Sequence, residues 1–417
     1  MLIHSATQLL TIATPPQKGS DLGQLNIIED GAVLVRDGKI AEVGSSQELW
    51  EKYADEEQLD AAGRVVMPGF VDPHTHVVWA GDRAAEFEMR LQGKTYLEIL
   101  EAGGGILSTV ESTRAASLEQ LVKETRPRLQ SMFQHGATTI EAKTGYGLDL
   151  ETETRMLEAL LVLDDEGPWE LAFTFLGAHA VPPEYVNKED EYTTLVADEM
   201  LPALKVWWGE KAGERQLPFV DVFCETGAFS LAQTELILVA AKELGFPLKV
   251  HADEFDNLGG TALAVELGAA SADHLVSISE KDVEALASGI TVAVGLPGTP
   301  FGLAEGDYTP AKDILEAGGT LAIASDLNPG TAWCENIQFA LALACRYMKL
   351  TPAQAIAAAT INAAAAIGRH EDVGSVEAGK QADLLILDVP DYRHLGYRFG
   401  TNLVQSVIKE GVVYPND

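Results

Sequence analysis

The chain has 417 residues, of which 47% are hydrophobic, so it is long enough for one large barrel with an appendage or for roughly two or three ordinary domains. Its 63 acidic and 29 basic residues give a formal net charge of −34, which opposes binding to nucleic acid phosphates and to anionic lipid. This composition excludes the disordered and fibrous classes, and it predicts neither a nucleic acid nor a membrane as partner.

The cysteines and the first residues indicate the cellular compartment. Cys224, Cys334 and Cys345 form no CxxC pair, and an odd count argues against a disulfide framework. The opening stretch MLIHSATQLLTIATPP lacks a basic segment before an apolar one, and no stretch reaches about 18 apolar residues. We therefore expect a soluble, cytoplasmic protein.

Both ends of the chain read as short β-strands. Two runs turn at Asp37-Gly38 and at Glu410-Gly411, which are hairpin signals. The strand-like runs cover 32–44, 64–69, 382–389 and 406–414. Because chain termini often lie close together, residues 1–68 and 376–417 are expected to form one composite β-sandwich domain.

Between these ends, short apolar runs alternate with helical stretches, which places the chain in the α/β class. Eight predicted strands begin at Gly69, Thr138, Leu171, Val220, Leu248, Ser271, Thr291 and Thr320. Eight is the strand count of a (β/α)₈ TIM-type barrel, here predicted over residues 69–375, and a doubly wound open sheet is the alternative. Most of these strands end in a polar or chargeable residue, which favours the barrel, since barrel active sites lie at the C-terminal ends of strands.

The sharpest local motif is Asp72-Pro-His74-Thr-His76. On an extended chain, residues two apart point the same way, so His74 and His76 could present both imidazoles to one cation. The alternative is a surface or packing pair. His251 and Asp326 each follow an apolar strand, and three imidazoles with one carboxylate suit zinc or ferrous iron with a position left for water.

These motifs carry a resemblance that extends from end to end. PGFVDPHTH, HADE, SADHL and SDLNPG, with the closing TINAAAAIG and GSVEAGKQADLLILD, resemble the metal-dependent amidohydrolase superfamily, whose members pair an eight-fold barrel with a small β-sandwich built from both termini. Within it, DPHTHVVWAGDRAAEFEM, EAKTGYGLDLETE, FLGAHAVPPEY and HADEFDNLGG are similar to the imidazolonepropionase family of histidine degradation.

The resemblance implies one divalent metal ion, zinc or iron(II). Its ligands would be His74, His76, His251 and Asp326. Many superfamily relatives hold two metals bridged by a carboxylated lysine, and Lys143 lies at a predicted strand end where such a residue could stand. Resemblance to a one-metal family argues against that role, and the alternative is an ion pair with Glu141 or another nearby carboxylate.

The resemblance also implies three catalytic residues, Glu254, His274 and Asp326. Glu254 would contact the substrate and the attacking water, taking its proton and passing it to the leaving nitrogen. Asp326 could share this proton transfer. His274 would hydrogen-bond the water or the developing oxyanion, and the alternative is that it orients a ligand.

The residues implied in substrate binding are Arg83, Tyr146, His179, Glu254, Asn328, Gly330 and Thr331. The guanidinium of Arg83 suits the carboxylate of a propionate tail, and the alternative is a surface ion pair with Glu86 or Glu88. Tyr146 and His179 could hydrogen-bond the ring or serve only in packing. The threonine at 331 departs from the serine associated with the family but keeps the hydroxyl.

Together these features predict a hydrolase with a small-molecule substrate. A metal-activated water would open 4-imidazolone-5-propanoate (imidazolone propionate) to N-formimidoyl-L-glutamate by breaking a C–N bond of a cyclic amide. One alternative is a one-metal aminohydrolase of a purine or pyrimidine ring, which would release ammonia. A second is a catalytically inactive scaffold, although all four ligands are kept. Family resemblance also predicts a homodimer.

Overall fold

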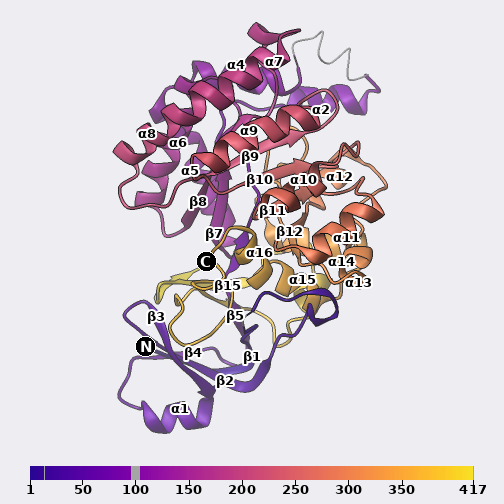
Figure 1. Cartoon of the computed structure of the whole chain (residues 1–417). Coiled ribbons are helices and arrows are strands. Elements are labelled where there is room, and N and C mark those ends of the chain that lie inside the picture. Colours follow the sequence, from indigo (N-terminus) through magenta and orange to yellow (C-terminus); the bar gives the residue numbers. More distant parts are fainter. Residues whose placement is uncertain (14, 95–103, 417) are drawn as a thin grey trace.

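A computed structural model of the chain describes residues 1–13, 15–94 and 104–416. Its strands form two sheets, a terminal sheet and a barrel, which occupy the two halves of the molecule in Figure 1. The N-terminus lies in the half that contains the terminal sheet, and the C-terminus lies between this sheet and the barrel.

The elements have the following bounds. The terminal sheet consists of β1 (Leu2–Leu10), β2 (Ile27–Arg36), β3 (Lys39–Ser45), β4 (Gln58–Asp60), β5 (Val65–Pro68), β14 (Leu384–Leu387), β15 (Val404–Lys409) and β16 (Val412–Pro415). The barrel consists of β6 (Phe70–Asp72), β7 (Ala137–Lys143), β8 (Glu170–Ala178), β9 (Phe219–Cys224), β10 (Lys249–Ala252), β11 (Ser271–His274), β12 (Val292–Gly295) and β13 (Leu321–Ile323). The helices are α1 (Ser46–Lys52), α2 (Ala84–Leu91), α4 (Ile106–Ala115), α5 (Leu118–Gln134), α6 (Leu150–Glu166), α7 (Glu189–Leu195), α8 (Leu201–Lys211), α9 (Leu231–Glu243), α10 (Gly260–Leu267), α11 (Glu280–Ser288), α12 (Gly298–Leu303), α13 (Ala311–Glu316), α14 (Ile337–Arg346), α15 (Pro352–Ala358), α16 (Ile361–Ala366) and α17 (His394–Tyr397).

The terminal sheet joins the two ends of the chain through the antiparallel pair β5 and β14. Its strand order is β16-β15-β14-β5-β1-β2-β3, with β4 paired to β1. The hairpin between β2 and β3 turns at Asp37 and Gly38, whose φ values of 51° and 73° are those that a tight two-residue hairpin requires. The prediction that strands from both termini assemble is confirmed.

The barrel strands run parallel in the order β6 to β13, and all eight predicted strand runs are present. A bridge between Thr75 and Leu327 brings the first and last edges together, so the barrel is nearly closed. Helices surround it (Figure 1). An open doubly wound sheet would leave these edges apart, so the predicted TIM-type barrel is confirmed and the open-sheet alternative is wrong.

Capping helps to fix where the outer helices begin. At the start of α9, the Ser230 hydroxyl accepts the backbone N–H of Gln233, and the Gln233 side chain accepts the Ser230 N–H. Such reciprocal caps satisfy backbone groups that a helix start leaves unpaired. This cap marks the end of the loop that connects β9 to α9.

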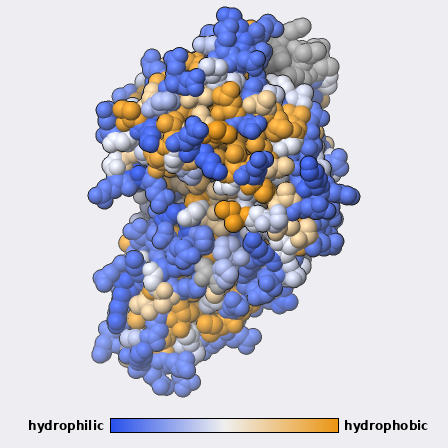
Figure 2. Space-filling model, in the orientation of Figure 1, coloured by the Kyte–Doolittle hydropathy of each residue, from blue (hydrophilic) through white to orange (hydrophobic). Residues whose placement is uncertain are grey.

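On the face shown in Figure 2, hydrophilic residues predominate and hydrophobic residues gather over the barrel half near α9. Leu231 and Leu236 of α9 are among the exposed apolar side chains. Within the described residues, no helix is both long and apolar enough to cross a membrane.

Candidate metal centre

Four barrel strands deliver a cluster of histidines and one aspartate to the same end of the barrel. His74 and His76 follow β6, His251 lies in β10, and His274 ends β11. Asp326 follows β13, and all five side chains are buried. Parallel strands end at the same rim, which is why residues so far apart in the sequence meet.

The donor atoms of this cluster converge. His76 Nε2 lies 3.3 Å from His251 Nε2, and Asp326 Oδ1 lies 3.5 Å from His74 Nε2. Two groups, His74 with His251 and His274, and His74 with His76 and Asp326, each keep their ligand atoms within 4.8 Å of one another. His74 Nε2 and Asp326 Oδ1 have no hydrogen-bond partner although they are buried. Convergent, unpartnered N and O donors fit a divalent cation of the zinc type.

Two buried aspartates orient the histidines from behind. His74 Nδ1 lies 2.7 Å from Asp273 Oδ2, and His251 Nδ1 lies 2.9 Å from Asp221 Oδ2. A carboxylate only accepts, so the hydrogen-bonded Nδ1 of His74 carries the proton and its Nε2 presents a lone pair to the cluster, whereas the His251–Asp221 approach is close without forming a hydrogen bond. Sequence reasoning missed both aspartates. The available signal was a charged residue inside a buried strand, Asp221 in the otherwise apolar β9 and Asp273 in β11.

Burial sets the protonation of these groups. It lowers the pKa values of His74, His76 and His274 well below their usual range, so these rings are neutral at pH 7 and able to bind a metal. Burial also raises the pKa of Asp326 to about 6, although a hydrogen bond from the Thr299 hydroxyl opposes the shift.

His274 and Asp326 adopt left-handed backbone conformations, with φ values of 82° and 54°. Residues with a side chain rarely adopt this region, and such strain concentrates at functional sites. Both residues lie at or just after the end of a strand, where the chain turns. The left-handed conformation allows the turn while the side chain faces the histidine cluster.

Glu254 stands next to His274 at the edge of the cluster, with Oε2 3.6 Å from His274 Nε2. Its side chain is 11% exposed. Burial, together with the negative charge of Asp326, raises the pKa of Glu254 well above its usual range. A carboxyl with a raised pKa in such a place is suited to proton transfer.

Tyr146 and His179 flank the cluster on another side. Their ring centroids are 5.3 Å apart, and the His179 ring stacks on that of His76 at 4.9 Å. Glu153 accepts hydrogen bonds from the backbone of the loop that carries Tyr146, including the N–H of Gly147 at 2.7 Å. His179 Nδ1 donates to a backbone carbonyl 3.0 Å away, so its Nε2 carries the lone pair. Burial lowers the pKa of His179 to about 3, which keeps the ring neutral.

Arg83 forms an ion pair with Glu86, which was the alternative left open by the sequence, but the pair is largely buried rather than on the surface. Its Nε and Nη2 donate to the carboxylate of Glu86, at 2.8 Å and 2.5 Å, and its side chain is only 13% exposed. The guanidinium also lies against Gly330, where an added Cβ would stand 2.3 Å from Nη1. A side chain at 330 would therefore have to displace the end of the Arg83 side chain.

Asn328 organises the loop that follows Asp326. Its amide N–H donates to the Asp326 carbonyl at 2.8 Å, and its Oδ1 accepts the backbone N–H groups of Gly330 and Thr331, each at 2.8 Å. The Thr331 hydroxyl lies 3.1 Å from the same oxygen. This arrangement holds the predicted substrate-binding residues of the loop beside the metal-ligand candidates.

Comparison with known proteins assigns the family. A model of the amidohydrolase family matches residues 65–414. The chain is 52% identical over 412 residues to an imidazolonepropionase of Herpetosiphon aurantiacus, covering 99% of this chain and 96% of that protein. It is 48% identical over 417 residues to an imidazolonepropionase of Chloroflexus aggregans, covering 99% and 98% of the two chains. The chain belongs to the imidazolonepropionases, within the amidohydrolase family.

Solved structures agree with this family at the level of fold. A triazine hydrolase variant matches with a TM-score of 0.78 at 16% identity, covering 99% of this chain and 94% of that one. E. coli guanine deaminase matches with a TM-score of 0.72 at 15% identity, covering 100% and 98%. Membership of the amidohydrolase family and the buried donor set together support a metal ion at this mouth of the barrel.

In this imidazolonepropionase-family chain, Lys143 is paired with carboxylates. Its Nζ lies 2.7 Å from Glu141 Oε1 and 2.8 Å from Asp221 Oδ2, and all three side chains are fully buried. Burial alone would lower the pKa of Lys143, but the surrounding carboxylates raise it above its usual range. These contacts match the ion-pair alternative that the sequence left open.

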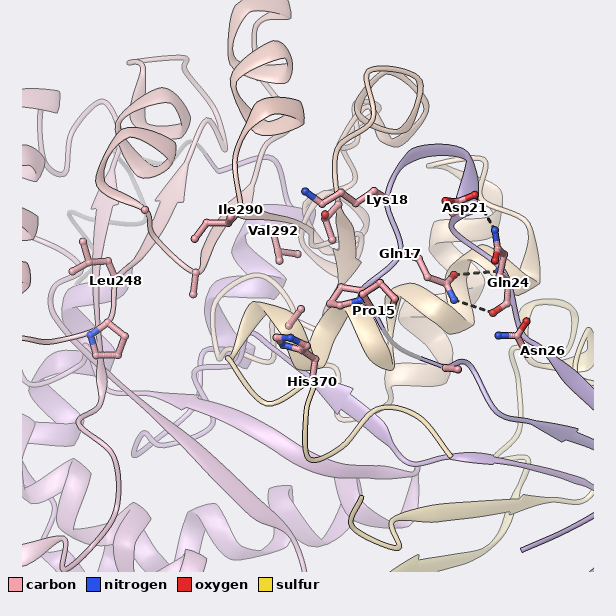
Figure 3. Close-up of a pocket in the computed structure, with 17 residues that line it drawn as sticks. Pro15, Gln17, Lys18, Asp21, Gln24, Asn26, Leu248, Ile290, Val292 and His370 are labelled. Carbon is pink, nitrogen blue, oxygen red and sulfur yellow. Dashed lines mark hydrogen bonds between the residues drawn. The ribbon is translucent and has the colours of Figure 1, made fainter. Parts of the chain in front are cut away.

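A separate cleft of about 770 Å³ lies at the opposite end of the barrel (Figure 3). It is lined by Leu248 and Val292, at the starts of β10 and β12, and by Lys18 and His370. The histidine cluster lies at the other ends of these strands. The cleft shares no residue with that cluster.

Proposed function

We propose that this chain hydrolyses 4-imidazolone-5-propanoate to N-formimidoyl-L-glutamate in histidine degradation. Water adds across the C–N bond of the cyclic amide, so the ring carbonyl becomes a carboxylate and the ring nitrogen gains a proton. The main support is the metal-ligand cluster, in which His74 Nε2 and Asp326 Oδ1 have no hydrogen-bond partner and converge with His76 and His251. The chain that carries this cluster belongs to the imidazolonepropionase family.

The proposed metal ligands are His74, His76, His251 and Asp326, and the proposed cofactor is one zinc or iron(II) ion. When bound, such an ion would lower the pKa of a water and polarise the ring carbonyl. The four side chains fit this role because they are buried and their donor atoms point at one another.

We assign the proton transfers to Glu254. Its carboxylate would take a proton from the attacking water and return it to the departing ring nitrogen. The nearby His274 would hydrogen-bond the developing oxyanion, and Asp326 would assist through its second oxygen, which now accepts from the Thr299 hydroxyl.

We assign substrate binding to residues around this mouth. Arg83 would bind the propionate carboxylate through the edge of its guanidinium that does not face Glu86, since that group has five N–H donors and gives two to Glu86. Tyr146 and His179 would contact the ring. Asn328, Gly330 and Thr331 would form the wall beside Arg83.

The experiment that tests this function is incubation of purified protein with freshly generated substrate. Loss of the imidazolone ultraviolet absorbance without ammonia release is the expected result. Ammonia release would point to the deaminase alternative, which the family assignment does not favour. A homodimer and a cytoplasmic location complete the proposal, and sedimentation and cell fractionation would test them.

A further inference from the structure

Lys143 lies at the centre of a buried charge cluster beneath the metal-ligand candidates. It ends β7, and its ammonium faces three carboxylates, Glu141 at 2.7 Å, Asp221 at 2.8 Å and Asp273 at 3.8 Å. All four side chains are 0% exposed. Buried charges of this kind are stable only when each has a partner and a fixed geometry.

The oxygens that face Lys143 are the ones that hold the imidazoles. Asp221 Oδ2, 2.8 Å from Lys143 Nζ, lies 2.9 Å from His251 Nδ1. Asp273 Oδ2, 3.8 Å from the same ammonium, lies 2.7 Å from His74 Nδ1. One ammonium therefore stands behind two carboxylate–histidine pairs that come from different strands.

A third connection runs through Glu141 to the segment between the two first histidines. Glu141 Oε2 accepts the backbone N–H of Thr75 at 3.1 Å, and the Thr75 hydroxyl donates to the Glu141 carbonyl at 2.6 Å. The Lys143 backbone N–H donates to the Thr75 carbonyl at 2.9 Å. Lys143 thus contacts Asp221 and Asp273, which lie against His251 and His74, and it contacts the Thr75 segment that precedes His76.

We propose that Lys143 is a positioning residue that fixes His74, His76 and His251 for a single metal ion, an inference that rests on the metal site of the proposed function. With the ammonium in place, Asp221 and Asp273 keep their rotamers and direct both Nε2 atoms at one point. Groups that orient metal ligands in this way typically contribute about 10- to 100-fold in metal affinity. In this role Lys143 remains an ammonium and does not bridge two metals.

The test is Lys143→Met, which keeps an unbranched side chain of similar length and removes the charge. We expect a folded protein whose zinc dissociation constant, measured by chelator competition, rises about 10- to 100-fold. With cobalt(II) as the probe, the ligand-field absorption spectrum should shift, because the histidines are no longer held in one geometry. Asp221→Asn should give a similar loss, and the double variant should lose less than the sum of the two.

Lys409→Met is the matched control, because Lys409 is also a buried ammonium paired with two carboxylates. Its Nζ lies 2.7 Å from Asp383 Oδ2 and 3.1 Å from Glu170 Oε2, and it belongs to β15 of the terminal sheet rather than to the histidine cluster. It should lose thermal stability without the shift in the cobalt spectrum. If Lys143→Met does not fold, Lys143→Gln carries the test, since its side chain can still donate a hydrogen bond to one carboxylate but has no charge.

The possible outcomes distinguish failure of the positioning role of Lys143 from failure of the proposed function. Wild-type protein that binds no metal would overturn the metal site itself. Wild-type protein that binds one metal and opens the ring, with Lys143→Met matching its zinc affinity and its cobalt spectrum, would overturn only the positioning role. Two tightly bound metals per wild-type chain would instead make Lys143 a bridging ligand.

Discussion

Glu254 Oε2 lies 3.6 Å from His274 Nε2, which places a carboxyl of raised pKa beside a neutral imidazole at the edge of the metal-ligand set. Both groups are close enough to share one water or one substrate oxygen. A bound cation would oppose the burial that raises the Glu254 pKa and would favour the ionised carboxylate. This pairing is the basis for assigning proton transfer to Glu254 and oxyanion stabilisation to His274.

Glu254→Gln should therefore keep its metal and lose activity. Because the amide cannot carry the proton, we expect turnover to fall by about 10² to 10⁴. Elemental analysis should show wild-type metal content. His251→Ala is the contrasting variant and should empty the site. Loss of metal from Glu254→Gln would mean that a ligand has been assigned as a base.

Removal of the metal should abolish activity. A chelator should inactivate the enzyme, and zinc or ferrous iron should restore it, since water is deprotonated near neutral pH only when a cation lowers its pKa to about 7. Elemental analysis should find about one ion per chain. Full activity in a chelated, metal-free sample would contradict the proposed ligand set.

Metal affinity should depend on pH through Asp326, whose pKa is raised by burial to about 6. Below this pH the carboxyl holds a proton that a cation must displace, and above it the carboxylate is already ionised. We expect the metal dissociation constant to rise about tenfold for each unit of pH below about 6 and to change much less above about 7. Chelator competition on the metal-free protein would measure this, and Asp326→Asn should abolish the proton-linked component. An unchanged affinity throughout this range would show that Asp326 does not bind the ion.

Arg83→Met tests recognition of the propionate tail. Loss of a charge-assisted contact costs about 1.5 to 3 kcal/mol, so KM should rise roughly 10- to 100-fold with a smaller fall in kcat. An imidazolone analogue without the carboxylate should be affected much less. Arg126→Met, which removes a surface pair with Glu166, is the matched control and should leave KM unchanged. Wild-type kinetics in Arg83→Met would show that Arg83 does not bind the substrate and serves only as the ion-pair partner of Glu86.

The strands were predictable because each barrel strand lies in a short apolar run, and most of these runs end in a polar residue. His74, His251 and Asp326 each mark such an end, and parallel strands place these ends on one rim. The composite domain of 1–68 and 376–417 and the barrel boundaries at 69–375 stay predictions. The strands of the terminal sheet fall inside the first two of these ranges.

The supporting contacts were harder to predict because they join residues that are far apart in the sequence. Asp273 lies 199 positions from His74, and no local pattern pairs them. Likewise, Thr299 reaches Asp326 from α12, the helix after a different strand. Arg83 shows the reverse case, in which a partner three residues away was foreseen but its burial against Gly330 was not.

The most direct test of ring opening is product analysis in ¹⁸O-labelled water with the metal-loaded enzyme. We expect stoichiometric N-formimidoyl-L-glutamate that carries one ¹⁸O atom in its newly formed carboxylate, with no ammonia released. Ammonia in proportion to substrate consumed, or intact substrate after incubation with fully metal-loaded protein, would contradict it.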